Sequence, residues 1–373
     1  MTSRERVVRT LQLEEPDRVP LDLGSTVTSI HKTAHKRLKE HLGVENGEEV
    51  IIDGLQQVVK PDERLLKRFD IDVRHVSLRP SVPWQRIGEG MYRDEWGIVY
   101  KEQSGYCEMV DHPLADITDA RGLEAYPWPD PHDERRFDGL EEEVRELNEH
   151  SDYAIMFGGF SESFFGLPSW LIGHERFYAD LIANEHFVNA VLDHLEDFFL
   201  QLADEALKRV GTLIQIVKVA DDLGTQSGPI LSPGLYRKLI KPRQKKLYTH
   251  IKERTDGKLF LHSCGSIYAF IEDFIENGVD VLNPVQISAA DMQPERLTQE
   301  FGGRLAFWGG GCDTQRVLPF GTEEDVEEEV KMRTEQFAPG GGFVFSAVHN
   351  IQYDVPPENT VAMYDTAKKY GKY

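Results

Sequence analysis

The sequence contains little cysteine and no long apolar stretch. Its three cysteines, Cys107, Cys264 and Cys312, are too few to form the disulfide framework of a small secreted fold. No apolar run approaches the about 20 residues that cross a bilayer, and the first residues lack the apolar core of a signal peptide. We therefore expect a protein of the reducing cytoplasm that does not enter a membrane.

Positive charge is also scarce. The chain has 42 Lys+Arg residues against 64 Asp+Glu residues, which gives a formal net charge of −22 at pH 7. Such a chain repels nucleic acid and anionic membrane surfaces, so neither is an expected partner. A neutral or cationic small molecule suits this charge better than a polyanion does. With 373 residues the chain can bury a large core without disulfides.

No GxGxxG motif follows the first expected strand, which disfavours a dinucleotide-binding fold. Instead, apolar runs typical of parallel strands buried on both faces recur along the chain. They lie at 19–24, 71–78, 153–159, 213–220, 259–262, 279–285, 305–309 and 343–348. Helical patterns follow most of them, at about 29–42, 161–209, 232–254, 266–277, 322–337 and 357–370. This alternation predicts the α/β class and a closed (β/α)8 TIM barrel, with an open doubly wound sheet as the alternative.

One segment interrupts the alternation after the second expected strand. Residues 84–110 are rich in Tyr, Trp and Gly, and Gly88 and Gly90 fit a hairpin turn. We expect an antiparallel β insertion there, followed at 111–150 by a surface linker and a helix. Residues 1–373 are expected to form a single TIM-barrel domain that carries these additions.

In a TIM barrel the catalytic residues lie at the C-terminal ends of the strands. Polar or reactive side chains at these expected ends are Asp222, His262, Cys264, Gln286, Trp308, Cys312, His349 and Asn350. We expect Asp222 and His349 to be catalytic. We expect His75, Gln286, Trp308 and Asn350 to line the substrate pocket. For Asp222, a loop-capping role is the structural alternative to acid–base chemistry or to orienting a metal ligand.

The His-x-Cys pair at the fifth strand end predicts a metal site. Alternate residues of an extended chain project to one side, so His262 and Cys264 can reach the same ion. Zinc accepts both ligand types, and a catalytic zinc site keeps three protein ligands and one open position. By position, the third ligand is His349 or Cys312. The structural alternative is that Cys264 is a small buried hydrophobe.

Several motifs resemble the uroporphyrinogen decarboxylase superfamily. They are the Leu-His-Ser-Cys-Gly of 261–265, the Gly-Gly-Gly-Cys-Asp-Thr of 309–314 with Leu-Pro-Phe-Gly-Thr at 318–322, and the Pro-Glu-Asn-Thr-Val-Ala-Met of 357–363. The resemblance is strongest over 210–373 and implies a (β/α)8 barrel. True decarboxylases of this superfamily carry an arginine-rich N-terminal motif that grips the carboxylates of their substrate. Residues 21–28 of this chain contain no arginine.

The site is more similar to the zinc-dependent corrinoid methyltransferases of the superfamily, such as methylcobamide:coenzyme M methyltransferases. Those enzymes bind zinc through a His-x-Cys on strand five and a Cys near strand eight. His262 and Cys264 match the first two ligands, whereas the third position holds His349. The resemblance implies Zn2+, a methylcobalamin or other corrinoid supplied by a partner protein, and a homodimer.

Two histidines and one thiolate leave a zinc site with one positive charge, which makes it a stronger Lewis acid than a neutral site. Such a site favours release of an alkoxide, a phenolate or an amine. We therefore expect a zinc-dependent methyltransferase that moves a methyl group between a small methylated, for example methoxylated, substrate or a thiol and the cobalt of a corrinoid protein. The alternatives are a metal-free decarboxylase of a carboxylated substrate and a non-catalytic barrel that binds a small ligand.

Overall fold

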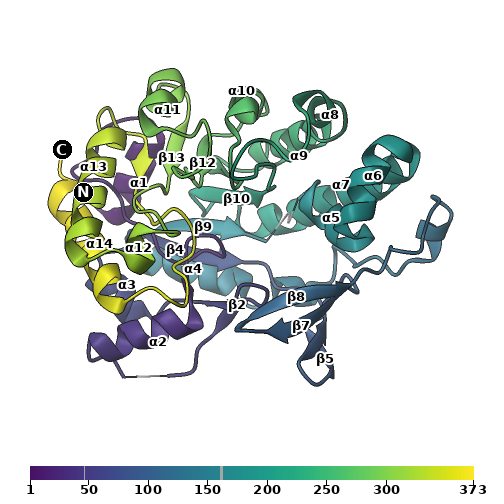
Figure 1. Ribbon diagram of the computed structural model, residues 1–373, viewed down its shortest axis with the longest axis horizontal. Helices are drawn as coiled ribbons and strands as arrows, with labels where there is room; N and C mark the ends of the chain where they lie inside the picture. Colours follow the sequence, from purple (N-terminus) through teal and green to yellow (C-terminus); the bar gives the residue numbers. More distant parts are fainter. Residues whose placement is uncertain (46, 160–162) are drawn as a thin grey trace.

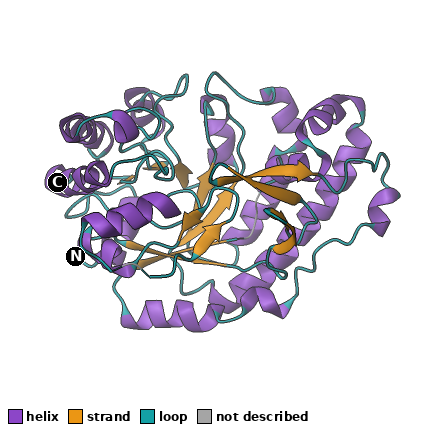
Figure 2. Ribbon diagram, turned by 60° about the horizontal axis from the view of Figure 1, so that its bottom comes forward, coloured by secondary structure: helices purple, strands orange, loops and turns teal. Residues whose placement is uncertain are grey.

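The computed structural model describes residues 1–373 except 46 and 160–162. At its centre is a seven-stranded parallel sheet in the order β14-β13-β12-β11-β10-β9-β4, which curls inside a layer of helices (Figures 1 and 2). Its strands are β4 (Val73–Ser77), β9 (Ala154–Gly158), β10 (Ile216–Ala220), β11 (Lys258–His262), β12 (Val281–Asn283), β13 (Ala306–Trp308) and β14 (Phe343–Val344). These strands fall within seven of the predicted apolar runs or, for β11, begin one residue earlier. The structure therefore confirms the α/β TIM-barrel fold class.

The eighth barrel position is filled by an irregular segment at 18–24. Leu21 forms a single parallel bridge with Phe345, which follows β14, and its carbonyl accepts a 2.9 Å hydrogen bond from Asp72 N, immediately before β4. The segment thus joins both edges of the sheet, but the predicted strand at 19–24 is reduced to one bridge. Pro20 has no N–H to donate to a ladder, which is why regular pairing is not established here.

Helices cover the outside of the barrel (Figure 1). Beyond the first three helices they are α4 (Leu140–His150), α5 (Gly166–Ile172), α6 (His174–Ala183), α7 (Glu185–Val210), α8 (Pro233–Leu239), α9 (Lys241–Lys252), α10 (Ile271–Glu276), α11 (Pro294–Phe301), α12 (Val317–Phe320), α13 (Glu323–Phe337) and α14 (Pro357–Tyr370). The predicted helical region at 161–209 contains α5, α6 and α7, and its expected start lies outside the described residues. Among the described helices, none combines the length and apolar character of a bilayer-spanning segment.

The N-terminal end of the barrel is closed by α1 (Ser3–Leu11). Thr2 and Glu5 form a capping box that starts this helix. Its Val7 and Leu11 pack into the interior cluster formed by inward-facing strand residues such as Phe260. The barrel interior is therefore a packed apolar core at this end.

Two antiparallel sheets flank the barrel. The strands β5 (Gln85–Gly88), β6 (Met91–Arg93), β7 (Val99–Gln103) and β8 (Tyr106–Asp111) form the predicted insertion, with Gly90 in the hairpin turn at φ +62. The small sheet of β1 (Ile30–His31), β3 (Val58–Val59) and β2 (Ile51–Asp53) is not predicted by the sequence. Because residues 30 and 31 pair with β3, the helix expected from 29 begins later, as α2 (Lys32–His41). A short α3 (Glu63–Arg68) precedes β4.

Candidate metal centre

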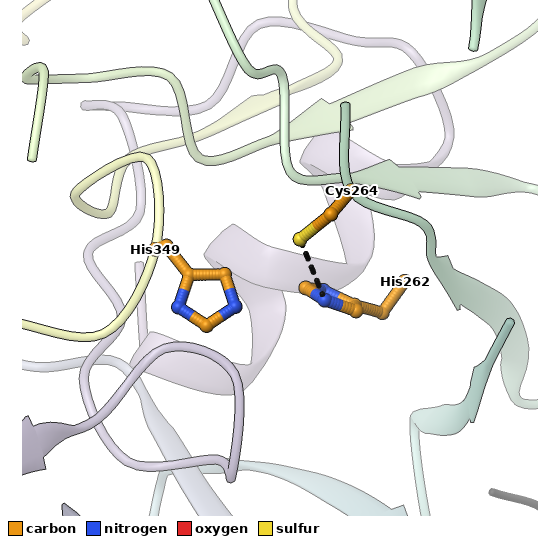
Figure 3. Close-up of side chains that lie close together, drawn as sticks. All are labelled: His262, Cys264 and His349. Carbon is orange, nitrogen blue, oxygen red and sulfur yellow. Dashed lines mark hydrogen bonds between the residues drawn. The ribbon is translucent and has the colours of Figure 1, made fainter. Parts of the chain in front are cut away.

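Three of the residues predicted as metal ligands converge at the C-terminal end of the barrel (Figure 3). One ligand atom from each of His262, Cys264 and His349 lies within 4.8 Å of the others. Cys264 Sγ is 3.3 Å from His262 Nε2, and the two imidazole rings meet edge to face with centroids 5.3 Å apart. The structure thus brings together a side chain that ends β11, one from the following loop and one from the loop after β14.

The orientation of His262 is set by the neighbouring strand. His262 pairs with Asn283 in the parallel register of β11 and β12, and its Nδ1 lies 2.6 Å from Asn283 Oδ1. Asn283 Nδ2 donates in turn to the carbonyl of Trp308 at 3.0 Å, so the amide oxygen is the atom that faces the imidazole. His262 therefore donates from Nδ1, and the lone pair on Nε2 is directed at Cys264.

The loop that carries Cys264 is held by backbone contacts with the loop after β10. A Cβ on Gly265, whose φ is +86, would lie 2.4 Å from the carbonyl carbon of Gly224. Cys264 N donates to Asp222 Oδ1 at 2.8 Å, and Gly265 N donates to Gln286 Oε1 at 2.8 Å. These contacts fix the thiol, and they show Asp222 and Gln286 supporting the loop.

Asp222 also reaches solvent beside the cluster. Its side chain is 56% exposed, whereas that of His262 is 4% exposed, and its Oδ1 is 3.6 Å from His262 Nε2. The preceding Asp221 is buried and accepts hydrogen bonds from Phe165 N and Gln244 Nε2. Burial raises the pKa of Asp221 to about 6. Of the two carboxyl groups, only that of Asp222 is accessible to a ligand.

The loop that carries His349 is anchored on both sides. Val348 N donates to the carbonyl of Cys312 at 3.0 Å, and Ile351 N donates to the carbonyl of Ser29 at 2.9 Å. Asn350, which has no exposed surface, accepts from Ser29 N through Oδ1 and donates from Nδ2 to Thr26 O and Gln56 Oε1. Asn350 therefore holds loops together and does not face open space.

The donor chemistry of the cluster fits zinc. Burial lowers the pKa of His349 to about 3, with the neighbouring His262 contributing, and burial also lowers the pKa of His262. Burial raises the pKa of the Cys264 thiol well above its ordinary value. At neutral pH the cluster thus consists of two neutral imidazoles and a thiol that loses its proton when a cation binds. Two imidazoles and a thiolate are a ligand set that zinc accepts.

Cys312, the other candidate for third ligand, lies elsewhere. Its thiol is fully buried and donates to Glu329 Oε2 on α13 at 3.5 Å. Among the described residues, His262, Cys264 and His349 form the group of candidate ligands that lie within 4.8 Å of one another, and Cys312 is not part of this group. The structure therefore places His349, and not Cys312, beside His262 and Cys264.

Trp308 and His75 both donate hydrogen bonds to the buried carboxylate of Asp22, a residue that we did not predict from the sequence. Asp22 accepts from His75 Nε2 at 2.7 Å and from Trp308 Nε1 at 2.9 Å, and it has no exposed surface. A Cβ on Gly24 would lie 2.6 Å from the His75 ring, so the glycine allows this packing. Trp308 is fully buried and lines none of the described cavities, whereas His75 lines one of about 290 Å³. Asp22 could have been found from the sequence, because it is a charged residue inside the apolar run 19–24.

A second cavity, also of about 290 Å³, lies between the barrel mouth, the insertion and α7. Its lining includes Asp53, Trp84, Trp96, Arg136, Phe198 and Lys218. Lys218 points into the barrel from β10 and donates to Thr26 Oγ1 at 2.8 Å. Burial is the main cause of the lowered pKa of His262 and of His349, and the positive charge of the Lys218 ammonium also lowers both pKa values. Lys218 therefore links the cavity with the cluster. This lysine could have been predicted as a site residue from the sequence, because it is a charged residue inside the apolar run 213–220.

Fold and site together define a TIM-barrel protein with a polar cluster where TIM-barrel enzymes have their active sites. The uroporphyrinogen decarboxylase (URO-D) family model matches residues 97–370. The chain belongs to this family.

Individual relatives are distant. The uroporphyrinogen decarboxylase of Pseudoalteromonas atlantica is 23% identical over 324 residues, which cover 82% of this chain and 81% of that protein. The enzyme of the same name from Alkalilimnicola ehrlichii is 24% identical over 280 residues, or 73% and 72% of the two chains. A solved methyltransferase from Methanosarcina mazei has a TM-score of 0.69 at 17% identity and covers 99% of both chains. This last likeness shows that the two proteins share a fold.

Proposed function

We propose that the protein is a zinc-dependent methyltransferase that moves a methyl group between a small methylated substrate or a thiol and the cobalt of a corrinoid held by a partner protein. The observation that carries this proposal is the convergence of His262, Cys264 and His349 within 4.8 Å. The shared fold with a methyltransferase supports it.

The three side chains would hold the metal, and the ion would supply a Lewis acid that lowers the energy of the leaving heteroatom. His262 and His349 provide neutral nitrogen donors, so Cys264 contributes the only negative charge of the ligand set. When the bond from the methyl carbon to the substrate heteroatom breaks, the electron pair stays on the heteroatom, which then takes up a proton. The proton would come from solvent, and we assign its relay to Asp222, because the exposed carboxylate of Asp222 lies beside the cluster.

Zinc content and methyl transfer in matched cysteine variants test the proposal. Purified protein is expected to bind one zinc ion, and Cys264→Ser is expected to lose it while remaining folded. Cys312→Ser is the control, since its thiol bonds to Glu329 away from the cluster, and it should keep zinc. Transfer between methylcobalamin and a panel of thiols and phenols should follow zinc content. Full zinc occupancy in Cys264→Ser would overturn the site.

Decarboxylation of a carboxylated substrate is the second candidate, favoured by the names of the curated relatives. It predicts activity that survives removal of metal with a chelator. The lack of arginine at 21–28, where true decarboxylases grip their substrate, weighs against it. Release of carbon dioxide by metal-free protein, without methyl transfer by the zinc-loaded form, would decide for the decarboxylase.

A further inference from the structure

The side chain of Asn283 is completely buried at the end of β12, between His262 and the backbone of β13. It has no exposed surface and makes two hydrogen bonds, one to His262 Nδ1 at 2.6 Å and one to the Trp308 carbonyl at 3.0 Å. A carbonyl oxygen can only accept, so the bond to Trp308 defines which end of the amide is the donor. The opposite end, Oδ1, can therefore only accept from the imidazole.

The glycine after Trp308 gives the amide this position. A Cβ on Gly309, whose φ is +87, would lie 3.2 Å from Asn283 Nδ2. The amide is thus enclosed by the His262 ring, the backbone of β13 and the close approach of Gly309. Its rotation would place Nδ2 against the imidazole and leave two carbonyl oxygens facing each other.

Acceptors on both sides of the ring compete for the single ring proton of neutral His262. Asn283 Oδ1 lies on the Nδ1 side, whereas the Asp222 carboxylate and the Cys264 sulfur, a weak acceptor 3.3 Å from Nε2, lie on the other side. Asn283 Oδ1 is 2.6 Å from Nδ1, whereas Asp222 Oδ1 is 3.6 Å from Nε2 and already accepts from Cys264 N. A separation of 3.6 Å is beyond a normal hydrogen bond, and 2.6 Å is well within one. The nearer acceptor determines the tautomer, so the proton resides on Nδ1.

We propose that Asn283 is a positioning residue that keeps His262 in the Nδ1–H tautomer with the Nε2 lone pair directed at Cys264 and His349. Its effect on metal affinity rests on the proposed zinc function, but the tautomer itself does not. A histidine that ligates a metal through one nitrogen needs a partner for the other, and loss of that partner lowers affinity by about 10- to 100-fold.

Three variants test the role. Asn283→Leu removes the acceptor and keeps the number and branching of the side-chain heavy atoms, and Asn283→Asp restores an acceptor for Nδ1–H. Asn359→Leu is the matched control, because Asn359 is also a buried asparagine but bonds to the carbonyls of Leu318 and Gly321. If Asn283→Leu does not fold, Asn283→Ser replaces it, since a serine hydroxyl is too short to reach the ring.

Two measurements are made on each variant. In zinc-free protein labelled with 15N-histidine, the imidazole nitrogen shifts of His262, assigned with His262→Gln, report the tautomer. We expect Nδ1–H in the wild type, Asn283→Asp and Asn359→Leu, and a mixture in Asn283→Leu. By competition with a chromophoric chelator, zinc affinity should fall about 10- to 100-fold in Asn283→Leu and stay within about tenfold of wild type in Asn283→Asp.

The outcomes separate this role from the proposed function. Wild-type affinity together with an unchanged Nδ1–H signal in Asn283→Leu would overturn the positioning role while leaving the zinc site intact. A wild-type protein that shows the Asn283-dependent tautomer but binds no zinc would overturn the proposed function and support the positioning of His262. An equal loss of zinc affinity in Asn359→Leu would show a general structural effect and overturn the assignment to Asn283.

Discussion

Two polar clusters lie at opposite ends of the barrel, and they are built differently. At the N-terminal end, Asp72 has no exposed surface and accepts hydrogen bonds from Ser3, Arg6, Arg18 and Leu21 N. At the C-terminal end, the cluster of His262, Cys264 and His349 joins groups that are neutral at neutral pH and contact each other.

The difference teaches how to separate structure from function in such a barrel. The Asp72 carboxylate is saturated by two guanidinium groups, a hydroxyl and a backbone N–H, so it ties α1 and the segment at 18–24 to β4. The C-terminal cluster brings donor atoms together, and the negative charges available to compensate a cation are the latent thiolate of Cys264 and the Asp222 carboxylate, 3.6 Å from His262 Nε2. A saturated cluster stabilises the fold, whereas a convergent one can bind a ligand, in accordance with the division of labour in TIM barrels.

The largest effect is expected from Asp72→Ala, which leaves Arg6 and Arg18 without their buried partner. Removal of one member of a buried ion pair costs about 3–5 kcal/mol. Urea unfolding should show this loss, while zinc per folded molecule stays unchanged. Asp365→Ala is the control, since its bidentate pair with Arg68 is about 40% exposed and is expected to cost less than about 1 kcal/mol. Equal losses in both variants would erase the distinction between the two clusters.

Gly265→Ala should damage the C-terminal cluster locally. The new Cβ would meet the backbone of Gly224 at 2.4 Å and would sit on a residue with φ +86. We expect a loss of about 1–3 kcal/mol from backbone strain and a drop in zinc affinity of at least about tenfold, because Cys264 moves. Gly105→Ala shares the positive φ (+89) but has open space around its Cβ. It should lose stability and keep zinc; loss of zinc there would contradict the contact argument.

His349→Cys changes the charge of the proposed site and keeps three ligands. A zinc ion held by one histidine and two thiolates is formally neutral and a weaker Lewis acid. We expect zinc affinity within about tenfold of the wild type. Methyl transfer from a phenyl methyl ether should be at least about tenfold slower, which corresponds to an activation free energy about 1.4 kcal/mol higher. Steady-state rates at matched zinc occupancy measure this effect. An unchanged rate would show that the charge of the site does not govern the reaction.

Among the test variants whose stability is measured, Asp94→Asn is expected to show the smallest change. Asp94 accepts from Ile98 N and the Tyr100 hydroxyl in the insertion, and burial raises its pKa to about 6 from an ordinary 3.8. Its stabilising contribution is complete below about pH 3.8 and is lost as the pH rises through about 6, so the ionised group costs stability at pH 7. The variant should therefore gain about 1–2 kcal/mol at pH 7 and nothing at pH 3.8. Unfolding curves at the two pH values test this difference.

The parts of the fold that were predicted correctly are those with strong local patterns. The continuous apolar runs of β9 to β13 and the Gly90 hairpin are visible in the sequence because burial on both faces and a positive φ each restrict residue choice. The sheet of β1, β3 and β2 was missed because two- and three-residue strands carry no periodic signal. The prediction of a regular strand at 19–24 was wrong, because Pro20 has no N–H and interrupts the ladder of hydrogen bonds.

For the site, the sequence by itself determined the chemistry of its donors: an imidazole and a thiol two residues apart at a strand end. The sequence also put forward His349 or Cys312 as the third residue, and only the tertiary structure decided that His349 lies beside them. His349 comes from a loop 85 residues after Cys264, and Asn283 faces His262 because β11 and β12 pair in one register. The physical reason is that side-chain chemistry is local, whereas the closure of the barrel and the register of its strands depend on contacts distributed over the whole chain.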